Sequence, residues 1–534
     1  KRQASYCTNV LVGGQYYGHS LGYDTNANKT TYTVHGSNGD QVYEYDYEKA
    51  SRVITKIAGP DGLNPVVSYK YEDVSKNPTW VKTEDADTGD AIEQWYGYTN
   101  GMVTNYACVF NTTNSPSNFW ASTWDTNWQV MTASVDPEGV KVELEYTNAS
   151  VSAVKIYYDT SNSYDSVMTY TTNGLLASFM NANGHWVSNY FNGYGFLTSS
   201  VPQVGVAVNQ EVNDLGYVTK QFIANEVGVY VISNSVDEIG RVNQTMYAQT
   251  GDTNASPLYE YFYWDAVGNL TNYVDRGGRA IRYTYLPDGK MASVSRTVGG
   301  SNLTTSIAYD NQFNTLSITD AKGRAVEQYS LDIHDRPVTV TNLEEQAMSV
   351  TYGLDLMVQQ IQRFDGTTVS NEFNTDGLLS KTHFPDSTNS YAYLKNGLLR
   401  SIADEGGSIS NGYNGANRLV TTEISGYLPQ IISIDYGHLP AGNLSNCVSV
   451  AGTETFGYDA GERMNSITAT RAGLPSLGFE IEYDQYRHGQ PTSITCTNTG
   501  IKVVYAWDTL GYIGSIKWTD SFSNVIRQLN YSKN

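Results

Sequence analysis

Apolar and polar residues alternate along many short stretches of the chain. Val140, Val142, Leu144 and Tyr146 alternate with lysine and glutamate, and residues 479–483 (FEIEY) repeat the pattern. A period of two places successive side chains on opposite faces of a sheet, so these stretches predict β-strands. No stretch shows the 3.6-residue period of an amphipathic helix. The sequence therefore predicts an all-β protein.

Turn-forming residues separate the predicted strands. Asp-Pro-Glu-Gly occupies 136–139, Pro-Asp-Gly occupies 287–289 and Asp-Ala-Lys-Gly occupies 320–323. Glycine adopts the positive φ that tight turns need, and aspartate accepts hydrogen bonds from the backbone just after it. We expect each pair of strands and its turn to form a hairpin, and successive hairpins to join into one antiparallel meander.

The hairpins recur as a sequence repeat. A turn glycine with an apolar residue two or three positions after it marks the copies, and Phe313, Asp335 and Asn417 fill the same place in weaker ones. The marker glycines are Gly174, Gly195, Gly216, Gly240, Gly268, Gly289, Gly377, Gly397, Gly461 and Gly511. The spacing of about 20 to 28 residues is typical of repeat architectures. We expect degenerate repeats over residues 1–140 and a regular array over 141–534, continuous with the first part and without a separate catalytic domain.

Tyrosine is expected to dominate the packing of this array, because the chain contains 43 of them. Tyr259, Tyr261 and Tyr263 alternate along one predicted strand and so share one face. Aromatic side chains on adjacent strands stabilise a sheet, and tyrosine buries its ring while its hydroxyl stays hydrated.

The order of these residues resembles the YD repeat of Rhs proteins: Tyr-Asp, a short turn, Gly-Arg/Asn-Leu and a second Asp-x-x-Gly. The matching stretches are 263–270 with 275–278, 309–310 with 320–323, 458–461 and 507–511. In that family the repeats form a long β-ribbon that coils into a hollow shell. Bacterial toxin complexes and Rhs effectors enclose a toxic domain in it, and teneurins display a related shell.

The resemblance implies tandem hairpins in one long antiparallel sheet, coiled into a hollow shell, spiral or tube. The effectors end their array with a plug and a self-cleavage segment, followed by a variable toxin. We find neither in this chain, and the Asp-Pro at 136–137 fits an ordinary repeat turn. The chain is therefore expected to lack its own toxin domain.

Charge and composition narrow the partners. Lys and Arg total 33 against 54 Asp and Glu, which gives a net charge of −21. So acidic a chain is repelled by phosphate backbones, which excludes nucleic acid as a partner. No apolar run is long enough to cross a bilayer, so we expect no membrane insertion. The polar, lysine-poor composition resembles that of secreted bacterial proteins and predicts an extracellular or cell-surface location.

Catalytic chemistry is not expected. The seven histidines show no metal-ligand spacing, and nucleophile, phosphate-loop and dinucleotide motifs are absent from the sequence. The repeated aspartates are interpreted as turn residues, because unique catalysts would not recur at every copy. We expect no catalytic residue, metal or cofactor.

Three sets of residues remain as candidate sites. The disulfide candidates are Cys7, Cys108, Cys447 and Cys496; three pairings are open, and a bridge between Cys447 and Cys496 would join neighbouring hairpins. The candidate aromatic surface is Phe119, Trp120, Trp124 and Trp128, unless Trp124-Asp125 fills a Tyr-Asp slot and the others pack in the sheet. The glycosylation candidates are Asn28, Asn111, Asn148, Asn243, Asn254, Asn269, Asn302, Asn443 and Asn530.

The leading expectation is a non-enzymatic structural protein that assembles with copies of itself, head to tail, into a tube or filament. The first alternative is a shell, or a segment of one, around a toxin polypeptide supplied by another chain. The second is an adhesion or glycan-binding module that uses the exposed aromatic residues.

Overall fold

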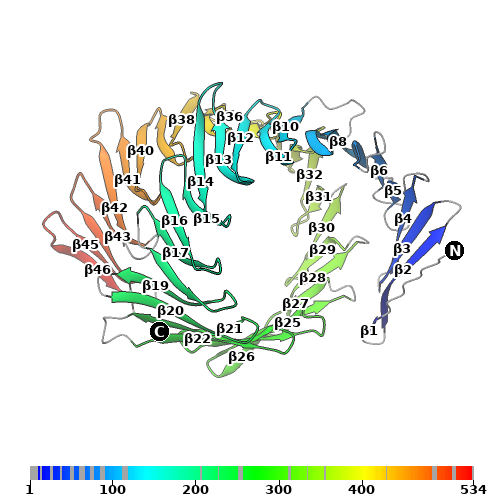
Figure 1. The fold of residues 1–534 in the computed structure, drawn as a ribbon, viewed down its shortest axis with the longest axis horizontal. Helices are drawn as coiled ribbons and strands as arrows, with labels where there is room; N and C mark the ends of the chain where they lie inside the picture. The colour runs from blue at the N-terminus through cyan, green and yellow to red at the C-terminus, as the bar shows by residue number, and fades with distance from the viewer. Residues whose placement is uncertain are drawn as a thin grey trace. The chain divides into compact units, whose positions relative to one another are not determined.

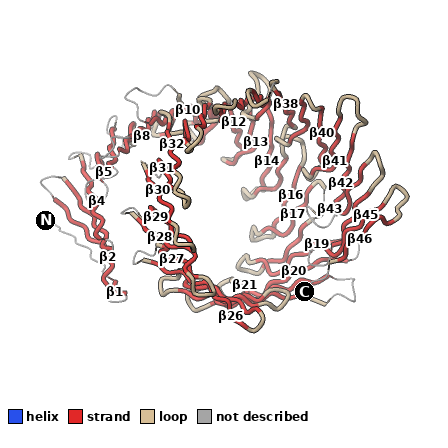
Figure 2. Tube along the Cα trace, turned by 180° about the vertical axis from the view of Figure 1, so that it is seen from behind, coloured by secondary structure: helices blue, strands red, loops and turns tan. Residues whose placement is uncertain are grey.

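Strands and the turns between them make up the described chain of the computed structural model (Figures 1 and 2). The structure describes residues 10–531 except 13–14, 25–27, 37–38, 49–52, 59–65, 72–76, 85–90, 111–117, 205–206, 226–227, 250–255, 311–313, 333–334, 354–356, 429, 484–489 and 508–512. The described residues form 46 strands and no helix, so the all-β prediction is confirmed. Within the same residues, nothing helical has the length and apolarity needed to cross a bilayer.

The chain divides into two units, each made of two sheet segments far apart in sequence. Unit 1 consists of Lys1–Gly139 and Ile281–Gly407, and unit 2 of Val140–Ala280 and Ser408–Asn534.

The strands of unit 1 are β1 Val10–Val12, β2 Gln15–Asp24, β3 Lys29–Gly36, β4 Gly39–Tyr47, β5 Ile54–Ala58, β6 Val66–Lys70, β7 Trp80–Glu84, β8 Ala91–Thr99, β9 Met102–Phe110, β10 Trp120–Asp125 and β11 Val130–Val135, followed in the second segment by β24 Ala280–Tyr285, β25 Met291–Val298, β26 Ser301–Tyr309, β27 Thr315–Thr319, β28 Ala325–Leu331, β29 Pro337–Asn342, β30 Ala347–Tyr352, β31 Val358–Gln362, β32 Thr368–Phe373, β33 Leu379–His383, β34 Thr388–Tyr393 and β35 Leu399–Ala403.

The strands of unit 2 are β12 Lys141–Thr147, β13 Ser150–Tyr157, β14 Ser163–Tyr170, β15 Leu176–Met180, β16 Trp186–Phe191, β17 Leu197–Pro202, β18 Val208–Val212, β19 Val218–Asn225, β20 Gly228–Val236, β21 Val242–Gln249, β22 Leu258–Trp264 and β23 Leu270–Val274, followed in the second segment by β36 Ser408–Tyr413, β37 Leu419–Ser425, β38 Ile432–His438, β39 Leu444–Ser449, β40 Gly452–Tyr458, β41 Met464–Thr470, β42 Leu477–Tyr483, β43 Pro491–Cys496, β44 Lys502–Trp507, β45 Ile513–Thr519 and β46 Val525–Asn530.

Consecutive strands pair antiparallel within each segment, as the hairpin repeat predicts. In β12–β13 the partner of Val142 is Ile156, and in β33–β34 the partner of Thr382 is Asn389. The predicted antiparallel meander is therefore confirmed. Few side chains are fully buried, and those that are, such as Ala107 and Ser493, are small. Most residues are half-buried, as a single sheet layer allows.

An aromatic residue at the end of one strand ties several of the hairpins to the strand before them. The pairing register shifts immediately before this residue, for example between Gly457 and Tyr458, and such a bulge re-aims the side chain. The Tyr458 hydroxyl then donates to the carbonyl oxygen of Leu444, the first residue of the preceding strand, at 2.9 Å. The same bond joins Tyr170 to Val151, Tyr309 to Met291, Tyr393 to Leu379, Tyr483 to Met464, Trp264 to Val242 and Trp507 to Pro491. Tyrosine and tryptophan can form this bond because each combines a long flat side chain with a hydrogen-bond donor.

The aspartate after the aromatic residue organises the turn. Asp265 Oδ1 accepts the backbone N–H groups of Val267 at 3.0 Å and Asn269 at 2.8 Å, and Gly268 between them has φ 100°. Other copies place asparagine in the aspartate position. The interpretation of the YD aspartates as turn residues is confirmed.

The repeat marker is misplaced by one residue in one copy. Gly461 does not have positive φ; it donates its N–H to Asp459 Oδ1, and the turn position with positive φ is Glu462, at 61°. Asp335 and Asn417 also occupy this position with φ near 60°, in agreement with the weaker copies. Phe313 and Gly511 lie outside the described residues.

Candidate functional site

Turns of one sheet segment contact turns of the other segment of the same unit. We call these turn-to-turn contacts the seam. At the unit 2 seam, the guanidinium of Arg418 in one turn lies 3.9 Å from the centre of the ring of Tyr164, near the start of β14, a cation–π contact. Beside it, a Cβ at Gly415 would lie only 2.3 Å from the carbonyl oxygen of Tyr158, so only glycine fits at this approach.

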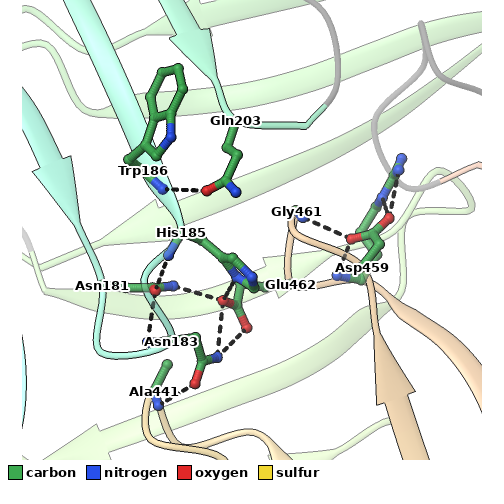
Figure 3. Close-up of polar contacts among 10 residues, drawn as sticks. Asn181, Asn183, His185, Trp186, Gln203, Ala441, Asp459, Gly461 and Glu462 are labelled. Carbon is green, nitrogen blue, oxygen red and sulfur yellow. Dashed lines mark hydrogen bonds and ion pairs between the residues drawn. The ribbon is translucent and has the colours of Figure 1, made fainter.

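The most polar part of the unit 2 seam is centred on Glu462 (Figure 3). Its Oε1 accepts hydrogen bonds from Asn181 Nδ2 at 2.7 Å and Asn183 Nδ2 at 3.1 Å, and lies 2.6 Å from His185 Nδ1. Asn183 Oδ1 in turn accepts the backbone N–H of Ala441 at 2.9 Å. Three side chains of the turn after β15 therefore bind the carboxylate of Glu462 in the turn after β40. The backbone of a third turn, which contains Ala441, is hydrogen-bonded to one of these three side chains.

The local conformations of the two turns position Asn181 and Glu462 for this contact. Asn181 Oδ1 accepts the N–H groups of Asn183 and His185, both at 3.0 Å, which leaves its amide nitrogen to reach Glu462. Glu462 sits at φ 61°, where a side chain costs about 1 kcal/mol or more relative to glycine. We interpret this cost as offset by the hydrogen bonds across the seam.

The Glu462 carboxylate is held in its charged form. Burial by itself would raise the pKa of Glu462, but hydrogen bonds from His185, Asn181 and Asn183 outweigh it, and the pKa lies below the usual glutamate value. The side chains of His185 and Glu462 keep 25% and 27% of their exposure, so the contact is only partly shielded from water. Water and salt therefore screen these hydrogen bonds less than those of a fully exposed carboxylate.

Unit 1 contains an equivalent seam. The Lys395 backbone N–H donates to Glu138 Oε1 at 2.7 Å, and Asn396 Nδ2 donates to Asp136 Oδ2 at 2.8 Å. These pairs are 257 and 260 residues apart, and the Ala441–Asn183 pair of unit 2 is 258 residues apart. In each unit, turns of the two sheet segments that lie nearly the same number of residues apart are thus in contact, and bonds from amides to carboxylates join them. We call the two segments of a unit the two passes of the sheet.

A half-open cavity of about 320 Å³ lies beside the unit 2 seam. Its lining is mainly apolar and includes polar residues of the seam and Ser200 of β17: Phe179, Asn181, His185, Trp186, Val187, Ser200, Pro202, Val204, Val208, Ala460, Gly461 and Glu462. Trp186, one of the lining residues, donates its backbone N–H to Gln203 Oε1 at 3.2 Å (Figure 3). No group of three or more potential metal ligands occurs in the part of the chain that the structure describes.

The predicted aromatic surface divides into two parts. Trp124 packs in the sheet, where its indole N–H donates to the Val103 carbonyl at 2.7 Å, and Asp125 accepts the N–H of Trp128 in the following turn. This is the Tyr-Asp slot arrangement. Trp120 and Trp128 are 44% and 65% exposed, and Phe119 is exposed as well. Only these three can contact a partner.

The predicted bridge between Cys447 and Cys496 is wrong. Both carry thiols, and they lie on β39 and β43 with three strands between them. Four strand spacings come to about 19 Å, well beyond the Cα separation of roughly 7 Å that a disulfide spans. Cys108 is a hydrogen-bond partner of the Tyr106 hydroxyl. Cys7 lies outside the described residues.

The glycosylation candidates have unequal access. Asn148, Asn243, Asn302 and Asn530 are exposed, whereas Asn28, Asn269 and Asn443 are half-buried. The amide of Asn269 already donates to Asp265 Oδ2 at 3.0 Å. Asn111 and Asn254 fall among residues that the structure does not describe. The modification itself stays a prediction.

Sequence reasoning missed the Glu462 cluster. The sequence feature that could have indicated it is a departure from the repeat, because Glu462 stands where most copies have the glycine with positive φ. The sequence analysis placed the repeat marker of this turn on Gly461 instead. Glu345 shares this position with φ 62°, yet its side chain makes no hydrogen bond or ion pair to any residue of the described ranges. The substitution alone therefore does not identify a seam residue.

Comparison with solved structures finds the same fold in Tc toxin components. The crystal structure of TcdB2-TccC3-Cdc42 matches with a TM-score of 0.58 and 12% identity, over 97% of this chain and 31% of that chain. The Photorhabdus luminescens Tc holotoxin pore with a TccC3 variant matches with a TM-score of 0.58 and 10% identity, over 95% and 32% of the two chains. The crystal structure of TcdB2-TccC3-TEV gives 0.57 and 12%, over 95% and 30%.

At these identities the likeness shows a shared fold, and it supports the YD-repeat fold that the sequence resemblance implies. The chain spans about a third of the length of the solved chains that it matches. No protein-family model and no curated protein sequence matches the chain.

Proposed function

We propose that this chain is a non-enzymatic wall segment of a secreted bacterial β-sheet shell that encloses a polypeptide, such as a toxin. The observation that carries the proposal is the seam. In each unit, separate passes of the sheet are joined by hydrogen bonds between their turns. A sheet whose successive passes are joined is a barrier, whereas a meander without a seam would leave gaps between passes.

The chemistry of the repeats supports a structural role over a catalytic one. The recurring aspartates, which are the most frequent candidates for acid–base chemistry, accept backbone hydrogen bonds in their own turns. Their arginine or asparagine neighbours complete the same turns, as Arg279 does at 2.7 Å from Asp275. These groups are committed to holding the hairpins. The fold shared with Tc toxin components is consistent with this role.

The test is protease protection of a polypeptide that co-purifies with the native chain. We expect such a polypeptide to survive trypsin while the seams are intact. It should be digested when Glu138→Ala and Glu462→Ala weaken both seams together. Glu345→Ala is the matched control, because Glu345 occupies the same turn position as Glu462 without a contact across the seam. The absence of a co-purifying polypeptide, or equal digestion in every variant, would contradict the proposal.

A specific observation also keeps assembly between copies as a second candidate. In β46, which pairs with β45, the neighbouring residues Val525 and Ile526 are 56% and 60% exposed. Exposed apolar side chains that lie next to each other form a patch that a second copy of the chain can cover. Concentration-dependent growth of the purified chain in light scattering, abolished by Ile526→Lys, would support this candidate; a concentration-independent mass would exclude it.

A further inference from the structure

Two asparagines whose side chains form hydrogen bonds across the seam belong to Asn-Gly pairs, the sequence most prone to deamidation. They are Asn183-Gly184 in unit 2 and Asn396-Gly397 in unit 1. A third pair, Asn173-Gly174, occupies the same place in a similar turn away from the seam. In all three turns the glycine N–H donates to the carbonyl three residues earlier at 2.9 Å. The glycine nitrogen is therefore held alike in the three turns, whereas the surroundings of the asparagine side chains differ.

The side chains differ in what holds them. Asn183 is fixed on both sides of its amide, by Glu462 and by the N–H of Ala441, and Asn396 donates to Asp136. Asn173 is exposed and makes no hydrogen bond within the described part of the chain. Deamidation requires the amide carbon to swing onto the next backbone nitrogen, so a side chain held at both ends reacts only when the seam opens.

Both acceptors of the seam amides are carboxylates. Deamidation of either asparagine replaces an N–H₂ donor with a negative charge directed at Glu462 or Asp136. Like charges at hydrogen-bond distance repel, and the bond that held the turns is lost. The new carboxylate therefore opposes reclosure of the seam.

We propose that the seam asparagines are deamidation sites that act as a one-way latch. The closed seam protects Asn183 and Asn396; an opened seam exposes them, and their deamidation keeps it open. In the reaction the glycine nitrogen forms a bond to the asparagine Cγ and loses its proton as the Nδ2 group leaves as ammonia. Water then opens the resulting cyclic imide to aspartate or isoaspartate. The step needs no other reactant.

The experiment incubates the native chain at mildly alkaline pH and follows deamidation of the three sites by peptide mass spectrometry. We expect Asn173 to react about tenfold or more faster than Asn183 and Asn396, since one hydrogen bond to a charged acceptor is worth at least that factor. Glu462→Gln should accelerate Asn183 and leave Asn396, in the other unit, unchanged. Equal rates at Asn173 and Asn183 in the native chain would overturn the protection.

The latch itself is tested with the products of the reaction. Asn183→Asp should accelerate hydrogen exchange at the Ala441 amide about tenfold or more, whereas Asn173→Asp should leave it unchanged. The paired variants share the same turn position, so a general loss of folding would affect both. Native-like exchange at Ala441 in Asn183→Asp would show that the seam recloses after modification and would refute the latch.

Discussion

Replacing Glu462 and Glu345 with glycine separates the contribution of the seam from the cost of its backbone conformation. Both residues adopt φ near 61° at the same turn position, and only Glu462 contacts another turn across the seam. Glycine removes the left-handed strain, which is worth about 1 kcal/mol. Glu345→Gly should therefore stabilise its turn by about that amount.

Glu462→Gly removes the same backbone strain, but it also removes the hydrogen bonds that the carboxylate accepts across the seam. Three donors bond the carboxylate, and hydrogen bonds to charged groups are worth about 1.5 to 3 kcal/mol each. The Glu462 side chain is about a quarter exposed, so water can replace part of these hydrogen bonds once the carboxylate is removed. We therefore expect the lost hydrogen bonds to cost roughly 2 to 4 kcal/mol of stability in total. Subtracting the strain relief leaves a net loss of about 1 to 3 kcal/mol.

The assay is hydrogen–deuterium exchange of individual turns, because a repeat array does not unfold in one cooperative step. Peptides that cover 181–185 and 439–443 should exchange roughly five- to a hundredfold faster in Glu462→Gly. Exchange at 342–346 should slow in Glu345→Gly. If both substitutions protect their own turns equally, Glu462 contributes nothing across the seam and the reasoning fails.

Two further predictions concern the repeat itself. Tyr458→Phe removes the hydroxyl bond to the Leu444 carbonyl and should destabilise that hairpin by about 1 kcal/mol in hydrogen exchange, whereas Tyr190→Phe, at a 56% exposed tyrosine, should not. Hydrogen bonding to Arg324 lowers the pKa of Asp320 to about 2, so its carboxylate should stay ionised far into acid in an NMR titration. A lowered pKa contributes stability above the unfolded value of about 3.9, and this contribution is lost as the pH falls from there through the folded value. Arg324→Ala should move the titration upward; an unchanged midpoint would contradict the assignment.

Strands and turns were predictable because their causes are local. The alternation at 140–146 and the Asp-Ala-Lys-Gly turn at 320–323 fix a hairpin without reference to the rest of the chain. Tyrosines in general were predicted to pack in the sheet. The bond of Tyr458 to Leu444 was not predicted, because it depends on a bulge that the sequence pattern does not reveal.

The seam was not predictable from the sequence. Its partners are separated by 257 to 281 residues, and the separation follows from small rotations summed over more than twenty strands. The same gap between local and cumulative geometry explains the error at Cys447 and Cys496. Cys496 lies two repeats after Cys447, and each repeat contributes two strands, so three strands lie between them.

A cryo-electron microscopy map of the purified chain, at a resolution that shows side chains, tests the central claim most directly. We expect the turn 181–185 to contact the turns 439–443 and 459–463 through Asn183 and Glu462, and the turn 136–139 to contact Asn396. Continuous hairpin sheets in which these turns lie apart, with neither carboxylate in contact with its amide, would show that the passes of the sheet are not joined and would contradict the account.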